Sequence, residues 1–70
     1  MKFSTRNLIK GTVTQITEGA VNVEVTIKTA EGVELVSIIT KAACENLGLA
    51  VGKEAYAAIK ASNVMIGIDE

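Results

Sequence analysis

Two short segments of the chain each carry a cation and hydrogen-bond donors but no carboxylate. Ser4-Thr5-Arg6-Asn7 lies near the start of the chain, and Lys60-Ala61-Ser62-Asn63 lies near its end. The oxygens of a tetrahedral dianion only accept hydrogen bonds, so a group made of cations, hydroxyls and backbone N–H groups suits such a ligand. The cations are Arg6 and Lys60, and the hydroxyls are those of Ser4, Thr5 and Ser62.

A site built only from donors also discriminates between oxyanions. Phosphate near neutral pH keeps a proton that needs an acceptor, and leaving such a donor unpaired costs about 1 to 3 kcal/mol. Sulfate, molybdate and tungstate carry no proton at that pH, so cavity size would have to separate them. The alternative is that the two cations simply face solvent and that Ser and Asn cap turns.

The residues needed for catalysis are missing from the chain. It contains no His, and its Ser and Thr residues do not stand in a spacing that pairs a nucleophile with a base. The one cysteine, Cys44, cannot form an internal disulfide and has no His to join it in a metal site. We therefore expect no enzymatic activity, and we interpret Cys44 as a small core residue rather than a nucleophile.

The first half of the chain predicts two strands. Ala20–Lys28 alternates Val and Ile with polar residues, as a half-buried strand does, and Leu8–Thr17 is rich in β-branched residues. The short Gly-containing connection between them predicts a β-hairpin. In the first strand Val13 and Ile16 fall on opposite faces, and Gly11 is a candidate for a bulge or sharp bend.

A third strand and a short helix follow. Residues Glu34–Thr40 are apolar on both faces, which is typical of a strand in a core or a subunit interface. Thr40 can cap a helix over Lys41–Leu47, and Gly48 can end it.

Two further strands are predicted at the end of the chain. Lys53–Ala61 is compatible with a helix by propensity, but its small side chains also fit a strand, and we interpret it as a strand. Asn63–Ile68 then forms the fifth strand. Three strands, a short helix and two strands predict an all-β fold, a small five-stranded OB-like antiparallel barrel in which the first and last strands can meet.

The size and composition of the chain predict association. Seventy residues make at most one domain, 1–70, and a chain of this size buries only about 60% of its unfolded surface. Hydrophobic residues nevertheless make up 49% of the chain. This apolar excess predicts an interface, and therefore a homo-oligomer.

The charge and the first residues of the chain indicate where it acts. A formal net charge of −1 gives no general attraction to nucleic acid or to an anionic membrane. Neither a signal-peptide pattern nor an apolar run of about 20 residues is present. We expect a cytoplasmic protein that binds neither nucleic acid nor membrane.

A series of segments resembles the molbindins, the molybdenum-pterin-binding proteins with a Mop-type domain. The resemblance covers essentially the whole chain and implies a cytoplasmic homohexamer, a trimer of dimers. Molybdate or tungstate would be its bound ligand, held at subunit interfaces for storage or buffering, with no organic cofactor. The segments are Ser4–Gly11, Gly19–Val25, Ser37–Thr40, Leu47–Leu49, Gly52–Glu54 and Ile59–Met65.

The resemblance also implies two types of oxyanion site. The first would use residues from more than one chain: Ser4, Thr5 (through its backbone), Arg6, Thr40, Lys60, Ala61 and Ser62. The second, near symmetry axes, would use Gly19, Ala20, Val21 and Asn22. The family often has Ala where this chain has Thr5. If this position contributes only its N–H, the difference is tolerated. If space is tight, the γ-methyl of Thr5 would alter anion selectivity.

Two other functions compete with oxyanion binding. OB-like barrels also bind single-stranded nucleic acid, through a basic groove and stacking aromatic residues, but Phe3 and Tyr56 are the only aromatics here. A regulatory or interaction module that keeps the fold without a ligand is the second alternative.

Overall fold

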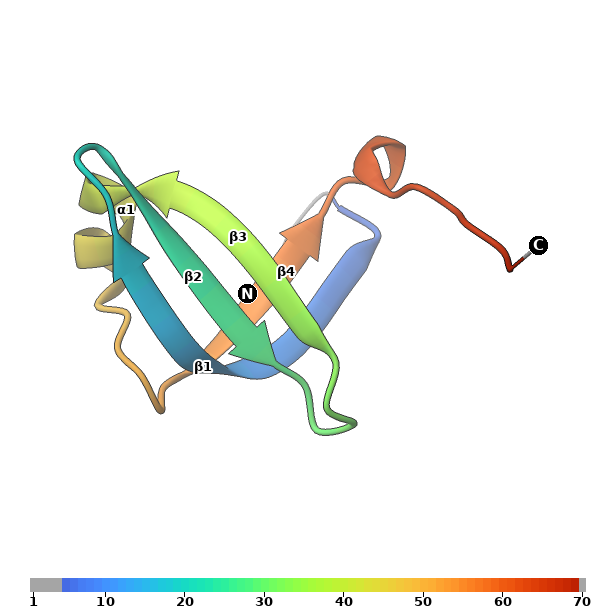
Figure 1. The fold of residues 1–70 in the computed structure, drawn as a ribbon, viewed down its shortest axis with the longest axis horizontal. Coiled ribbons are helices and arrows are strands. Elements are labelled where there is room, and N and C mark those ends of the chain that lie inside the picture. The colour runs from blue at the N-terminus through green and yellow to red at the C-terminus, as the bar shows by residue number, and fades with distance from the viewer. Residues whose placement is uncertain (1–4, 70) are drawn as a thin grey trace.

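The computed structural model describes residues 5–69, in which four antiparallel strands form one sheet (Figure 1). The strand order is β3-β2-β1-β4, and one α-helix lies between β3 and β4. The all-β class, the first hairpin and the position of the helix are therefore as predicted. The elements are β1 (Asn7–Glu18), β2 (Asn22–Lys28), β3 (Glu34–Thr40), α1 (Lys41–Leu47), β4 (Glu54–Ile59) and the 3-10 helix η1 (Ala61–Asn63).

The long strand β1 joins two parts of the sheet. Its first half pairs with β4 and its second half pairs with β2, and Thr12 lies opposite both Lys28 and Glu54. The sheet curls around β1 into a half-barrel (Figure 1). One continuous strand thus sets the positions of both ends of the chain.

A bulge in β1 resolves the conflict between Val13 and Ile16, which simple alternation places on opposite faces. The register with β2 shifts between Val13 and Gln15, which leaves Thr14 as an extra residue. An extra residue changes the phase of the alternation. Val13 and Ile16 consequently lie opposite Ile27 and Val25, and both face the core.

Gly11 is not the bulged residue, but its lack of a side chain has a steric reason. A Cβ atom at this position would lie 2.9 Å from the backbone oxygen of Lys28. The buried Gly11 therefore allows β1 and β2 to approach closely where the sheet curls.

Side chains from β1 and β2 form the core of the curled sheet. Four buried side chains form it: Val13, Val23, Val25 and Ile27. On β3, Leu35 and Ile39 pack against this core, whereas Val36 and Ile38 remain 62% and 69% exposed. One face of β3 thus lies against the core, as predicted, whereas the other is exposed in the single chain, and its place in a subunit interface stays a prediction.

The short helix α1 begins and ends at the predicted residues. The hydroxyl of Thr40 accepts a hydrogen bond from the N–H of Ala43 at 3.0 Å, and Gly48 closes the helix with φ of 62°. A left-handed conformation of this kind suits glycine, because it has no Cβ. Among the described residues, no helix has the length and apolar character needed to cross a membrane.

The segment with two possible conformations is a strand, β4, as we interpreted it. Ala55, Ala57 and Ile59 are half-buried and alternate with exposed residues, which is the pattern of a strand packed on one side. The small alanine side chains fit against the core where β4 pairs with β1. Sheet pairing thus outweighs the helix propensity of this segment.

The prediction of a fifth strand over Asn63–Ile68 is wrong for the single chain. Asn63 ends η1, and residues 64–69 form no strand within the described part of the chain. This C-terminal tail leads away from the sheet (Figure 1), with Met65, Ile66 and Ile68 between 87% and 93% exposed. A strand needs a partner edge, and η1 turns the chain away from both edges.

Candidate anion-binding site

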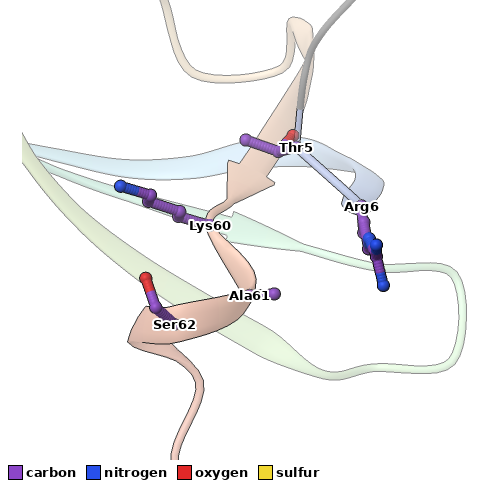
Figure 2. Close-up of a pocket in the computed structure, with 5 residues that line it drawn as sticks. All are labelled: Thr5, Arg6, Lys60, Ala61 and Ser62. Atoms are coloured by element: carbon purple, nitrogen blue, oxygen red, sulfur yellow. The ribbon is translucent and has the colours of Figure 1, made fainter.

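Pairing between β1 and β4 brings the two donor segments together. Asn7, the first residue of β1, lies opposite Ile59, the last residue of β4, and its side-chain amide donates a hydrogen bond to the Ile59 oxygen at 3.1 Å. The residues just before β1 therefore meet those just after β4. They line one hollow, shown in Figure 2: Thr5, Arg6, Lys60, Ala61 and Ser62.

The 3-10 helix η1 shapes the lower wall of this hollow. The N–H of Asn63 donates to the oxygen of Lys60 at 2.9 Å, and the N–H of Val64 donates to the oxygen of Ala61 at 3.3 Å. These bonds turn the chain sharply after β4. In Figure 2 the Ser62 hydroxyl points back toward the side of the hollow that carries Lys60.

The hollow is positive and contains no acidic side chain. Among the described residues the one ion pair joins Lys10 to Glu54, so Arg6 and Lys60 have no carboxylate partner there. Their side chains extend in different directions from the hollow (Figure 2). One chain thus supplies two cations to the hollow, but the two charged groups do not point to the same place.

Thr5 contributes a feature that the sequence did not reveal. Its hydroxyl oxygen is buried and has no hydrogen-bond partner among the described residues. Buried polar groups in folded proteins are nearly always paired, so an unpaired one in the wall of a hollow indicates a position where a ligand can bond.

A second hollow differs in its charge. It includes Lys10 and Lys28 but also Glu31 and Glu54. The Nζ atom of Lys10 forms an ion pair with Oε2 of Glu54 at 3.1 Å. The hydrogen bond to Glu54, helped by its negative charge, raises the pKa of Lys10. A dianion placed there would face two carboxylates, which makes the first hollow the better oxyanion site.

The structure separates Thr40 from the other residues predicted for the first site. Thr40 pairs with Asn22, and the N–H of Lys41 donates to the oxygen of Val21 at 3.1 Å. Within one chain Thr40 therefore lies beside the loop predicted for the second site. That loop is Gly19, Ala20, Val21 and Asn22, closed by a hydrogen bond from the Gly19 N–H to the Asn22 oxygen at 2.8 Å.

The first donor segment also contains Ser4 and Asn7. Ser4 lies outside the described residues. Asn7 was not among the predicted site residues. In the structure its side chain links β1 to β4 through the hydrogen bond to the Ile59 oxygen. The predicted strand began at Leu8, so the sequence placed Asn7 just before it, and the pairing of Asn7 with Ile59 could not be read from the sequence.

Comparison with known proteins places the chain in a family. The family model of the TOBE domain matches residues 4–66. A probable molybdenum-pterin-binding protein of Haemophilus influenzae is 49% identical over 69 residues, which cover 99% of this chain and 100% of that protein.

Solved structures show the same fold. MopII from Clostridium pasteurianum superposes with a TM-score of 0.90 at 37% identity, over 96% of this chain and 100% of that one. ModG, described as a cytoplasmic molybdate-binding protein and solved with molybdate bound, gives a TM-score of 0.94 at 48% identity. The match covers 99% of this chain but 49% of ModG. The resemblance seen in the sequence is confirmed: the chain belongs to the TOBE-domain family and, within it, to the molbindins, the molybdenum-pterin-binding proteins.

Proposed function

We propose that this protein binds molybdate or tungstate and stores or buffers it in the cytoplasm. The observation that carries the proposal is the hollow at the joined ends of β1 and β4, which combines Arg6, Lys60 and hydroxyl groups without a carboxylate. The relatives support the choice of ligand, because ModG is described as binding molybdate and as cytoplasmic.

The donor set favours an oxyanion without a proton. Arg6 and Lys60 provide charge-assisted hydrogen bonds, and Ser62 adds a hydroxyl. Monohydrogen phosphate would bring a proton that finds no carboxylate acceptor in the hollow; it would cost about 1 to 3 kcal/mol if left unpaired, or would occupy a hydroxyl that otherwise donates to the anion. Selection against sulfate then rests on the size of the completed site.

The site is completed by association of subunits in this proposal. In one chain the cations of Arg6 and Lys60 diverge, and Thr40 lies at the other end of β1 (Figures 1 and 2). A neighbouring copy could bring its Thr40 to the hollow. The resemblance to molbindins suggests a homohexamer, a trimer of dimers, in which residues 1–70 of each copy form one Mop-type domain.

Exposed apolar side chains support association. Val36 and Ile38 on β3 and the tail residues Met65, Ile66 and Ile68 are all more than 60% exposed in the single chain. An exposed apolar surface of this kind is typical of a subunit interface. A second site type, at Gly19, Ala20, Val21 and Asn22, would lie where these loops from several copies meet.

Ligand binding and assembly should be linked. An anion that bridges subunits binds only the assembled state, and it stabilises that state by about 2.7 kcal/mol per site when its free concentration is 100 times its dissociation constant. The bound anion would thereby stabilise the oligomer that holds it.

Native mass spectrometry tests both parts of the proposal. The purified protein is measured alone and with added molybdate, tungstate, sulfate or phosphate. We expect a hexamer that gains several molybdate or tungstate ions and little sulfate or phosphate. A protein that takes up none of the four oxyanions would refute the binding function, and molybdate bound by a monomer would refute the shared site.

A further inference from the structure

Within the described part of the chain, Thr5 carries a buried polar atom that lines the hollow and lacks a partner. Its hydroxyl oxygen is shielded from water, and no donor or acceptor among residues 5–69 lies within hydrogen-bonding reach. The side chain lines the hollow together with Arg6 and Lys60 (Figure 2). The neighbouring Asn7 shows the contrast, because its polar side chain is paired with the Ile59 oxygen.

An unpaired buried hydroxyl destabilises the free protein. It has lost its hydrogen bonds to water and has gained none from residues 5–69 in return. A valine in its place would have nearly the same shape without this penalty. Among residues 5–69 the hydroxyl therefore has no partner that would stabilise it, and a ligand in the hollow is a candidate for that partner.

A bound oxyanion is a partner of the right chemistry. Its oxygens accept hydrogen bonds, the Thr5 hydroxyl can donate one, and the cations of Arg6 and Lys60 lie on the same hollow. A hydrogen bond to an ionised acceptor is also stronger than one between neutral groups.

We propose that the Thr5 hydroxyl donates a hydrogen bond directly to the bound oxyanion. Thr5 then contributes its side chain to the site and raises the affinity for the bound oxyanion. This inference rests on the proposed function, because it assumes that the hollow is the oxyanion site.

Three variants test it: Thr5→Val, which keeps the branched shape and removes the hydroxyl; Thr5→Ser, which keeps the hydroxyl; and Thr17→Val, the same change at an exposed position near the other end of β1. Molybdate affinity is measured by titration calorimetry, and thermal unfolding is measured without the anion. Size-exclusion chromatography confirms that each variant keeps the assembly of the original protein.

Removal of the hydroxyl should lower molybdate affinity without lowering the stability of the anion-free protein. Thr5→Val should bind molybdate about tenfold more weakly or worse, while its unfolding temperature without anion stays equal or rises. Thr5→Ser should bind within about threefold of the original protein, since it keeps the donor and loses only the γ-methyl. Thr17→Val should change neither binding nor assembly.

Other results would overturn the inference in distinguishable ways. Unchanged affinity in Thr5→Val, with molybdate still bound, would remove Thr5 as a donor and leave the proposed function intact. A lower unfolding temperature in the anion-free Thr5→Val protein would show that the hydroxyl has a structural partner instead. Failure of the original protein to bind molybdate would refute the proposed function together with this inference.

Discussion

Asn7 and Ile59 are 52 positions apart in the chain, yet they form the last pair of the β1–β4 ladder and share a side-chain hydrogen bond of 3.1 Å. This pair stands at the edge of the hollow. Thr5 and Arg6 precede one member, and Lys60 to Ser62 follow the other. The pair therefore holds the two donor segments of the proposed site side by side.

Replacing Asn7 should loosen this junction. Asn7→Ala removes a partly buried hydrogen bond and should lower the free energy of unfolding by about 1 kcal/mol. Molybdate affinity should fall as well, because the two segments lose their link. Urea unfolding and titration calorimetry measure the two effects, and Asn46→Ala, an exposed change on α1, serves as the control. Equal stability of Asn7→Ala and the original protein would contradict this role.

Arg6 and Lys60 should matter for binding and not for the fold. Both side chains are exposed and have no ion-pair partner among the described residues. Arg6→Ala and Lys60→Ala should therefore change the free energy of unfolding by no more than about 0.5 kcal/mol. Loss of a charge-assisted hydrogen bond should weaken molybdate binding by about tenfold or more. Lys28→Ala removes the same charge in the second hollow and is the control for calorimetry. Unchanged affinity in both site variants would refute the site.

Thr40 has a structural role in α1 and a proposed role in binding, and two variants separate them. Thr40→Ala removes the cap and should destabilise the protein by about 1 kcal/mol. Thr40→Asp keeps a good capping side chain but adds a negative charge, so it should preserve stability and weaken molybdate binding. Calorimetry and urea unfolding of both variants provide the test. Full binding by Thr40→Asp would show that Thr40 serves only as a cap.

Gly11 should not tolerate a side chain. A Cβ atom there would lie 2.9 Å from the Lys28 oxygen, so Gly11→Ala forces β1 and β2 apart and should cost about 1 to 3 kcal/mol of stability. Gly67→Ala introduces the same methyl group where nothing lies within 4 Å. Thermal unfolding should distinguish the two variants, and equal melting temperatures would argue against a steric need for glycine at position 11.

The C-terminal tail should govern assembly. Replacing both Ile66 and Ile68 with Ser removes exposed apolar side chains that touch little within one chain. Light scattering after size exclusion should show a smaller particle, whereas circular dichroism should show an unchanged strand content. Gln15→Ser, an exposed polar change on β1, is the control. A double variant that keeps the full oligomer would exclude these two residues from the interface.

Local patterns were sufficient to predict much of the fold. The alternation of Val23, Val25 and Ile27 predicted β2, because side chains of a strand point to opposite faces in turn. The cap at Thr40 and the stop at Gly48 predicted α1, because both depend on the conformation of one or two residues. The two donor segments were also recognisable from residue type alone.

Tertiary structure decided what depends on distant partners. The bulge at Thr14 exists only in the pairing of β1 with β2, and it places Val13 and Ile16 on the same face. The tail after η1 is no strand in the single chain, because no sheet edge lies beside it. The sharing of one hollow by Arg6 and Lys60 follows from the β1–β4 ladder, and the lack of a partner for the Thr5 hydroxyl among the described residues is visible only in the folded chain. The sequence determined which groups could bind an oxyanion, and long-range strand pairing decided which of them meet, because that pairing joins residues that no local spacing connects.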